Sequence, residues 1–450
     1  MKQLKVLSPT AILGYGFPIE SFENGMALDP DVIAVDAGST DPGPYYLGAG
    51  VSFTDRTAVK RDLEIMIKAG LEREIPVIMG TAGGSGADVH LKWCVEIVRE
   101  ILLENKLKAK TAIISAEVPK STVAGYYKAG EIVPLDFVPE LTEKDIEDST
   151  RIAAQMGMEP IIKALDSEAD IIIAGRCYDP AVFAALPVMK GFQKGLSLHM
   201  GKILECAAIA ADPGSGSDCM MGVISESGFR IFPLNQERRC TTMSVSAHTL
   251  YEKSNPYMLH GPDGIIDLRN CEFIQADDNA VEVRGTGFIN SERHMVKLEG
   301  ARLTGYRTIS IAGVRDPVMI DGIDGIVEYV KKTVKKQFAD MDYKLIFRIY
   351  GMNGVMGDNE PLKTCGHELG VIIDAVAGSQ KDSDSVCSFA RSTMLHYGYE
   401  GRISTAGNLA FPFSPSDIKA GEVYEFCIYH LMPYESGIFE CKWMEALDEN

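Results

Sequence analysis

The apolar residues in the first half of the chain follow two alternating patterns. Short runs made wholly of apolar residues fit strands buried on both faces, and longer stretches with apolar residues three or four positions apart fit amphipathic helices. The predicted strands are 5–13, 32–35, 77–79, 111–114 and 171–174. The predicted helices are 19–27, 56–74, 88–105, 142–165, 179–186 and 197–211. Because such strands need a helix layer on each face, we expect a Rossmann-like parallel α/β domain over residues 1–215.

The second half of the chain has shorter strand-like runs separated by turns. The predicted strands are 220–223, 229–232, 280–283, 308–312, 344–350 and 423–430, and the predicted helices are 245–252, 322–336 and 382–394. This mixed order indicates an α+β domain over residues 216–450, with the turn-rich segment 212–218 as the seam. We expect the second domain to complete the site and to supply oligomer contacts. In the first domain, a capping box at Thr142–Asp145 marks the start of the helix predicted at 142–165.

Charge and composition exclude some classes of partner. The chain carries a formal charge of −19, so it is poorly suited to bind a nucleic-acid backbone or an anionic membrane. No apolar run approaches the roughly 20 residues that a membrane span needs. The first residues lack a signal-peptide pattern, and the ten cysteines contain no Cys-x-x-Cys pair. We therefore expect a cytoplasmic protein with reduced thiols.

Polar and ionisable residues follow the predicted strands of the first half. They are Asp36, Ser39, Glu117, Arg176 and Asp179. The carboxyl ends of parallel strands share one edge of a sheet, where ligands bind in open α/β folds, so we expect an active crevice there. Ser39, Arg176 and Asp179 would bind an anionic substrate in this crevice. Asp36 and Glu117 would transfer protons, although the carboxylates could instead cap helices or form a solvated ion pair with a lysine.

The stretch GTAGGSGADVH (residues 80–90) joins a predicted strand to a predicted helix. It lacks the Lys-Ser/Thr pair of a P-loop, and its glycine spacing does not fit the dinucleotide-binding pattern. A glycine-rich turn before a helix still exposes N–H donors to a carboxylate or phosphate. The expected donors are Gly83, Gly84, Ser85 and Gly86. We expect Asp88 to cap the helix, and His90 to be either a proton carrier or a packing residue.

A second concentration of reactive residues lies at 199–260. Lys202 shares one face of a predicted helix with His199 and Cys206, and it is a candidate catalytic residue. Arg239, at a predicted helix start, is a candidate anion-binding residue. Three thiols could hold a divalent metal or an iron–sulfur cluster, but their spacing matches no metal motif, and the cofactor is unknown. They are Cys206, Cys219 and Cys240.

Several segments together resemble the acyclic terpene utilisation (AtuA-like) family. They are GTAGGSGAD, IIIAGRCYDPAVFAALP, HMGKILECAAIA and TTMSVSAHTLYEKSNPYMLHGPDGIIDL. The chain departs from the family pattern after Glu205-Cys206 and at Arg238-Arg239, so it resembles a divergent stand-alone branch. The resemblance implies degradation of branched acids, often as CoA thioesters, by hydratases or lyases. It also implies a small, separately encoded partner protein, and we expect a homo-oligomer.

The leading hypothesis is a hydro-lyase that acts on a small branched hydroxy acid or its CoA thioester. Adding or removing water next to a carboxylate needs an acid, a base and a group that holds the anion. One alternative is a carbon–carbon lyase acting on a 3-hydroxy acid, in which carboxylates or histidines would hold a divalent metal. The other alternative is a non-catalytic substrate-binding subunit, whose crevice would contain arginine and N–H groups alone.

Overall fold

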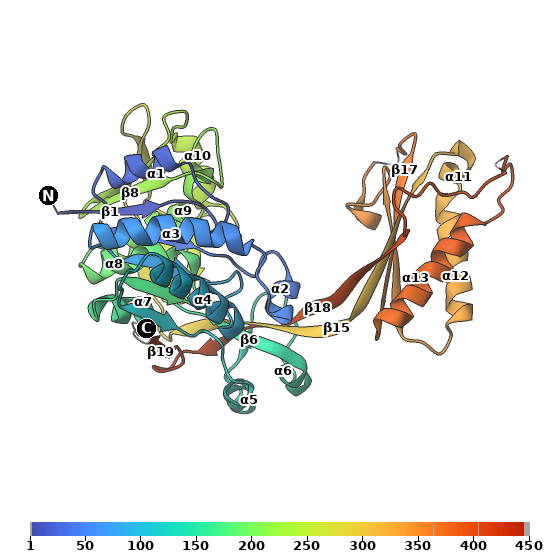
Figure 1. The fold of residues 1–450 in the computed structure, drawn as a ribbon, viewed down its shortest axis with the longest axis horizontal. Helices are drawn as coiled ribbons and strands as arrows, with labels where there is room; N and C mark the ends of the chain where they lie inside the picture. Colours follow the sequence, from blue (N-terminus) through green and yellow to red (C-terminus); the bar gives the residue numbers. More distant parts are fainter. Residues whose placement is uncertain (1, 363, 404, 445–450) are drawn as a thin grey trace. The chain divides into compact units, whose positions relative to one another are not determined.

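The computed structural model describes residues 2–362, 364–403 and 405–444. The chain splits into two compact units. Unit 1 contains the residues up to Arg302 and those from Phe426 onward, and unit 2 contains Leu303–Glu425 (Figure 1). This division differs from the predicted domains 1–215 and 216–450, because several strands that follow residue 216 pair in the main sheet of unit 1.

Unit 1 is built on a ten-stranded mixed sheet whose central strands are parallel. In sheet order, the parallel strands are β1 (Gln3–Ser8), β2 (Val32–Asp36), β3 (Val77–Gly80), β7 (Ile171–Ala174) and β4 (Thr111–Ile114). The antiparallel strands beside β1 are β8 (Met220–Ser225), β9 (Gly228–Pro233), β13 (Val281–Arg284) and β12 (Glu272–Gln275), and beside β4 lies β19 (Cys441–Trp443). Mixed helices and sheets with parallel pairs are confirmed, but the strand order is not the 3-2-1-4-5-6 order of a Rossmann fold.

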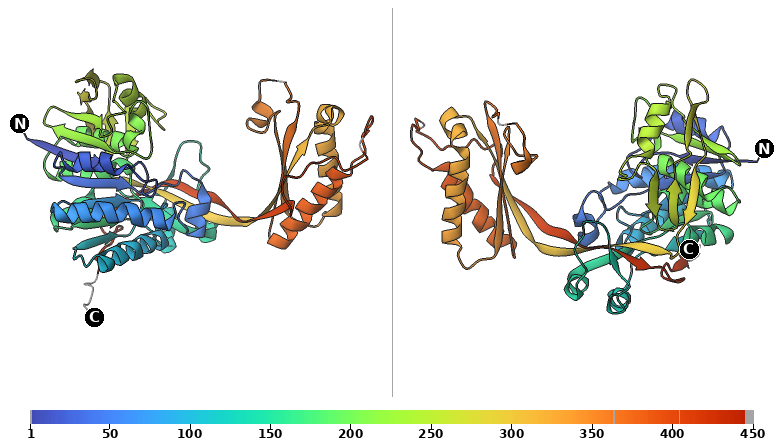
Figure 2. Two further views of the ribbon diagram at one scale, coloured as in Figure 1. Left: turned by 45° about the horizontal axis from the view of Figure 1, so that its top comes forward. Right: turned by 180° about the vertical axis from the view of Figure 1, so that it is seen from behind.

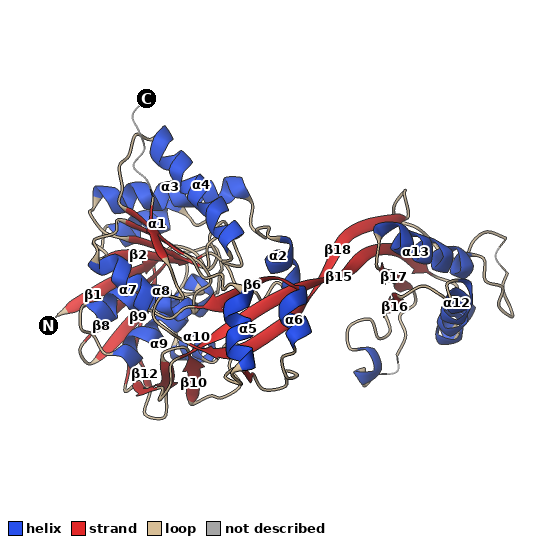
Figure 3. Ribbon diagram, turned by 90° about the horizontal axis from the view of Figure 1, so that it is seen from below, coloured by secondary structure: helices blue, strands red, loops and turns tan. Residues whose placement is uncertain are grey.

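Helices cover both faces of this sheet (Figure 3). One layer contains α1 (Ile19–Met26), α3 (Arg56–Glu72) and α4 (Asp88–Glu104), and the other contains α7 (Glu159–Asp166), α8 (Asp179–Met189) and α9 (Lys194–Leu204). Neighbouring strand residues point to opposite layers: Val32 and Ala34 join one core, and Ile33 and Val35 join the other. Burial on both faces explains why these strands are continuous apolar runs in the sequence.

The helix predicted at 142–165 is wrong as a single element. The structure has α6 (Glu143–Asp148), β6 (Ser149–Gln155) and α7 in this region. The capping box is confirmed, since the Thr142 side chain accepts from the Asp145 N–H and the Asp145 side chain accepts from the Thr142 N–H. Residues 149–155 form a strand because they pair antiparallel with β15 (Met295–Val314), and this long-range partner outweighs the local helical spacing.

Unit 1 contains further short elements around the main sheet. They are α2 (Pro44–Ala49), α5 (Lys120–Lys128), β5 (Val133–Pro134), α10 (Thr242–Thr249), and a small sheet of β10 (Met258–Gly261), β11 (Gly264–Asp267) and β14 (Gly287–Asn290). The predicted helix at 197–211 is shorter than expected, because α9 ends at Leu204 and a single 3₁₀ turn (Ala207–Ala210) follows. Among the described helices, none combines the length and the apolar composition needed to cross a membrane.

Unit 2 is a smaller sheet with two main helices. Its strands are the second part of β15, β16 (Tyr343–Tyr350), β17 (Leu369–Ala377) and the first part of β18 (Asp417–Pro433), in the sheet order β16-β17-β15-β18. Its helices are α11 (Pro317–Asp321), α12 (Ile323–Gln337) and α13 (Gln380–Leu395). Figure 2 shows α12 and α13 on one face of the sheet, where their apolar residues build a separate core. The chain order and the sheet order together are those of a split β-α-β arrangement.

Candidate active site

The loops that follow β2, β3 and β7 pack directly against one another at the carboxyl edge of the parallel strands. A Cβ atom on Gly38, after β2, would lie 2.3 Å from the Gly84 carbonyl oxygen. Gly86 has a φ of +70°, and a Cβ atom there would lie 2.2 Å from the backbone nitrogen of Arg176. The Arg176 N–H donates to the Gly86 carbonyl oxygen over 3.0 Å. Only glycine permits these backbone approaches, which bring the ends of β2 and β7 to one place.

The expected N–H donors of the glycine-rich stretch are buried in this packing. Residues 81–87 are all buried. The Gly84 N–H donates to the Thr81 carbonyl oxygen over 3.1 Å. The Ser85 hydroxyl is buried and has no hydrogen-bond partner among the described residues. Close loop packing therefore accounts for the glycines, and anion binding by this backbone stays a prediction.

Arg176 is the centre of a buried group of charges. Its side chain is 3% exposed, and its Nε lies 2.8 Å from a Glu299 oxygen while its Nη1 lies 2.9 Å from an Asp179 oxygen. Burial opposes the charge, but these two carboxylates outweigh burial and raise the pKa of Arg176 above its usual value. Asp179 is the first residue of α8 rather than its cap. The role of its side chain is therefore better explained by the ion pair with Arg176 than by helix capping.

Glu299 and Lys297 reach Arg176 from the start of β15. Glu299 is completely buried, and the Lys297 Nζ lies 2.7 Å from its Oε1. Burial alone would raise the pKa of Glu299, but Arg176 and Lys297 lower it to about 2. Sequence reasoning missed both residues. The signal that could have found them is their alternation with buried Val296 and Leu298, which places two opposite charges on one face of a strand.

α9 adds a second buried ion pair, between Lys202 and Glu205. The two side chains lie one helical turn apart and are 3% and 6% exposed. Burial raises the pKa of Glu205 to about 7, against the opposing effect of Lys202, and Asp179 adds to the rise. The second carboxyl oxygen, Oε2, is buried without a hydrogen-bond partner in the described part of the chain. Glu205 can therefore gain or lose a proton near neutral pH.

Asp36, at the end of β2, is a second carboxyl with a raised pKa. It is 5% exposed, and one of its oxygens accepts from the Gly38 N–H over 3.2 Å. Burial is the main cause that raises the pKa of Asp36 well above its ordinary value, repulsion from Asp179 adds to it, and Arg176 opposes it. The raised pKa favours the protonated form of Asp36, which can act as a proton donor.

Lys253 and Tyr178 lie beside these carboxyl groups. The Lys253 Nζ lies 5.8 Å from the centroid of the Tyr178 ring. Burial lowers the pKa of Lys253, and repulsion from Lys202 lowers it further, while Glu205 and Asp179 oppose the change. Burial also raises the pKa of the Tyr178 hydroxyl, with Glu205 as the next cause. Both residues are therefore electrostatic neighbours of Glu205.

We call these interacting groups the charge cluster, and all of them belong to unit 1. Its members are Asp36, Arg176, Asp179, Lys202, Glu205, Lys253, Lys297 and Glu299. Carboxyl groups and cations are equal in number, and the raised pKa of Asp36 favours its neutral form, which shifts the balance of the charge cluster toward positive charge. The predicted residues Asp36, Arg176, Asp179 and Lys202 are brought together here. A surplus of buried positive charge favours an anionic ligand.

His90 and Glu117 lie outside the charge cluster. His90 is buried on α4, where its Nε2 lies 3.0 Å from the Tyr46 carbonyl oxygen, and burial lowers its pKa. Glu117 accepts from the Asp88 N–H over 2.9 Å and so caps α4 from outside the helix. The expectation that Asp88 caps this helix is wrong, because Asp88 is the first helical residue and its own side chain accepts from the Ser115 hydroxyl.

Ser39 and Arg239 also interact elsewhere. The Ser39 hydroxyl donates to Asp41 over 2.8 Å within its own turn. The Arg239 side chain is 63% exposed and lies 3.8 Å from Asp212. The structure therefore does not bring Arg239 to the charge cluster, because its segment pairs with the backbone of Asp212 near the surface.

The three-cysteine alternative is not supported. Cys219 faces one core of the main sheet and Cys240 faces the other, so their thiols cannot meet. Burial raises the pKa of Cys240 to about 12. Within the described ranges, no group of three or more histidine, cysteine, aspartate and glutamate side chains is placed to hold a metal ion.

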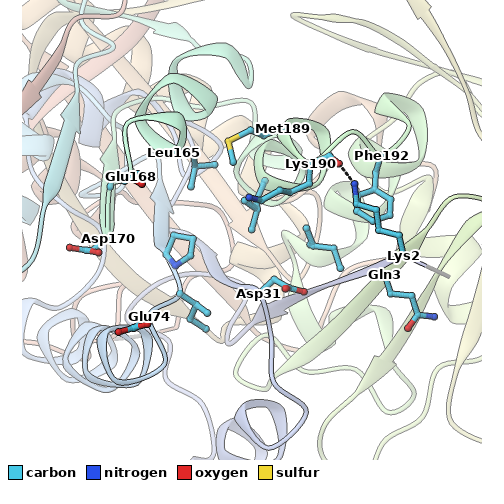
Figure 4. A pocket seen from close by; sticks show the side chains of 15 residues that line it. Lys2, Gln3, Asp31, Glu74, Leu165, Glu168, Asp170, Met189, Lys190 and Phe192 are labelled. Atoms are coloured by element: carbon cyan, nitrogen blue, oxygen red, sulfur yellow. Dashed lines mark hydrogen bonds between the residues drawn. The ribbon is translucent and has the colours of Figure 1, made fainter.

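A separate pocket of about 520 Å³ lies at the opposite edge of the parallel strands (Figure 4). Its lining includes residues that precede or begin strands, such as Gln3, Asp31, Pro76 and Asp170. Ligands of open parallel sheets bind at the carboxyl edge, and the pocket in Figure 4 lies at the amino edge. The charge cluster is therefore the stronger candidate for the active site.

Comparison with known proteins gives one match. The sequence model of the family described as acyclic terpene utilisation family protein AtuA matches residues 55–408, which is most of the chain and includes nearly all of the charge cluster. Searches of curated proteins and of solved structures each gave no significant match. Family membership suggests a role in acyclic terpene utilisation. The chain belongs to the acyclic terpene utilisation family AtuA.

Proposed function

We propose that the charge cluster is the active site of a hydro-lyase that acts on a small branched hydroxy acid or its CoA thioester. The observation that supports this proposal is the pair of carboxyl groups with raised pKa, Asp36 and Glu205, beside buried cations. Perturbed carboxyl groups of this kind concentrate at catalytic sites. The role that the family name gives to its members, acyclic terpene utilisation, fits a branched substrate.

In the dehydration direction, the two carboxyl groups have complementary tasks. The Glu205 carboxylate takes a proton from the carbon next to the substrate carbonyl, and neutral Asp36 donates its proton to the departing hydroxyl group. The C–O bond breaks, a carbon–carbon double bond forms, and water leaves. Glu205 then holds one proton more and Asp36 one proton less. Return of that proton from Glu205 to Asp36 restores the starting state.

The buried cations stabilise the charge that develops during this step. Arg176 is held rigidly by Asp179 and Glu299, so its own hydrogen bonds orient those carboxylates rather than a substrate. Lys202 holds Glu205 in position through one carboxyl oxygen and leaves the other free. Preorganised charges in a site without water lower the barrier to forming an enolate.

The test is turnover of branched 3-hydroxy acids and their CoA thioesters, with products followed by mass spectrometry and by ultraviolet absorbance of the new double bond. Glu205→Gln and Asp36→Asn should each lower kcat by about 10²–10⁴-fold, because each removes one proton-transfer group. Glu23→Gln, which changes an exposed acid on α1, is the control and should leave turnover unchanged.

Other outcomes would change the proposal. Shorter carbon fragments as products would identify a carbon–carbon lyase instead. Saturable binding without any turnover would identify a substrate-binding subunit. Full activity in both Glu205→Gln and Asp36→Asn would remove the charge cluster as the active site.

A further inference from the structure

Lys253 is the cation of the charge cluster that lacks a partner. Arg176, Lys202 and Lys297 each form an ion pair with a carboxylate. Within the residues that the structure describes, the Lys253 ammonium forms neither an ion pair nor a hydrogen bond, and its contact is with the Tyr178 ring. Lys253 is half-buried, so its ammonium group can still be reached by an anionic ligand.

The Tyr178 hydroxyl is also unpartnered. It is buried, the residue is 6% exposed, and no described residue forms a hydrogen bond with the hydroxyl. The ring packs so tightly that a Cβ atom on Gly261 would lie 2.8 Å from it. This packing leaves the ring little room to turn toward another partner, because Gly261 belongs to a paired strand, β10.

The third unpartnered atom is the Oε2 of Glu205, described above. Glu205 is an electrostatic neighbour of both Tyr178 and Lys253. Buried polar atoms in folded proteins are nearly always hydrogen-bonded, so the two unpartnered oxygens, on Tyr178 and Glu205, are unusual. An ammonium donor, a hydroxyl donor and a carboxyl oxygen together fit an acyl group whose oxygen carries or develops negative charge.

We propose, building on the function proposed above, that Lys253 and Tyr178 form the subsite for the acyl oxygen of the substrate, with Glu205 Oε2 beside the neighbouring carbon. The ammonium and the hydroxyl both donate to this oxygen, which becomes anionic when the carbon loses its proton. The oxygen can belong to the carboxylate of a free acid or to the carbonyl of a CoA thioester. The free acid and the thioester both present an oxygen that accepts hydrogen bonds, and they differ in whether CoA is attached.

Equilibrium binding tests this subsite without requiring turnover. The probes are 3-hydroxy-3-methylbutanoate and its CoA thioester, with CoA alone to measure binding by the carrier, and binding is measured by titration calorimetry. Tyr178→Phe and Lys253→Met should each weaken binding of the recognised acyl probe by about 10–100-fold, because each loses one donor to a charged oxygen. The matched controls Tyr257→Phe and Lys92→Met change exposed residues and should bind as the parent does.

Thermal unfolding separates this role from a structural one. Tyr178→Phe removes a buried hydroxyl that has no partner, so the melting temperature should stay the same or rise while binding weakens. A merely structural tyrosine would give the opposite result, with a lower melting temperature and unchanged binding. If Lys253→Met fails to fold, the binding measurement on Tyr178→Phe alone still tests the subsite.

The two proposals can fail separately. Parent-like affinity for both probes in Tyr178→Phe and Lys253→Met would overturn the subsite and leave the assignment of Asp36 and Glu205 untouched. Weakened binding in these variants, in a protein without turnover, would support the subsite and remove the hydro-lyase. The absence of saturable binding of either probe to the parent protein would overturn the subsite.

Discussion

Each unit contains a carboxylate that lies between two cations. In unit 1, Glu299 on β15 contacts an arginine and a lysine. In unit 2, Asp374 on β17 lies 3.0 Å from the Arg307 Nε and 2.7 Å from the Arg348 Nη1. The two arrangements look alike as ion pairs, but their surroundings differ.

The difference is the access of water to the cations. Arg307 and Arg348 are each 39% exposed, whereas Arg176 is 3% exposed. Water solvates the cations of unit 2, so their attraction to Asp374 is screened and modest. In unit 1 the charges are desolvated, and each one depends on its partners. Burial together with unpartnered polar atoms, rather than the number of ion pairs, therefore distinguishes the candidate site.

Removing the shared carboxylate of unit 1 should have the largest effect. Glu299→Gln leaves Arg176 and Lys297 without their common counter-charge in a buried position, so the free energy of unfolding should fall by about 3–5 kcal/mol. Urea denaturation followed by circular dichroism measures this change. A loss below about 1 kcal/mol would mean that water reaches Arg176 and that the two carboxylates are equivalent.

The pH dependence of stability is a second test of the comparison between the two units, because the buried Glu205 carboxyl titrates within the charge cluster of unit 1. The pKa of Glu205 rises from its ordinary value of 4.5 to about 7. Between these values the folded protein binds more protons than the unfolded chain. The stability that Glu205 contributes is therefore present below its ordinary pKa and is lost as the pH rises through about 7.

Glu205→Gln should remove this dependence. The stability of the parent relative to this variant should fall, on the order of 2–3 kcal/mol, as the pH rises from about 4.5 to about 7.5. Urea denaturation at a series of pH values gives the difference. A constant difference across this range would show that the Glu205 pKa is not raised in the folded protein.

The smallest effect is expected in unit 2. Asp374→Asn leaves two cations that water already solvates, so the free energy of unfolding should change by about 1 kcal/mol. The same urea series measures it, and turnover and probe binding should be unchanged because unit 2 holds no member of the charge cluster. A loss as large as that in Glu299→Gln would contradict the distinction between the two units.

Local pattern predicted much of the fold. The runs at 32–35, 77–79, 111–114 and 171–174 are strands, and the helices predicted after most of them are present, because these elements depend on near neighbours in sequence. The helix predicted across residues 149–155 is wrong, because this segment forms a strand whose partner, β15, lies far along the chain. The Rossmann-like arrangement of the parallel sheet is not confirmed, and periodicity could not have specified it, since it does not say which strands are adjacent.

The sequence likewise predicted part of the candidate site. Asp36, Arg176 and Asp179 follow strands, and parallel strands deliver such residues to one edge. Glu117 and His90 satisfy the same rule but are used for capping and packing near α4. Position at a strand end therefore selects candidates, and side-chain partners decide between function and structure.

The sequence by itself determined the elements and the residues at their ends, because hydrophobic periodicity and turn chemistry act over a few residues. Only the tertiary structure decided which charges meet. Glu299 lies 123 positions from Arg176 along the chain and reaches it because the start of β15 pairs with β6. Burial of the meeting point then raises the pKa of Asp36 and Glu205, whereas Arg176 and Lys297 lower the pKa of Glu299 against the effect of burial. These shifts follow from desolvation and from the neighbours assembled by the fold, which no local pattern contains.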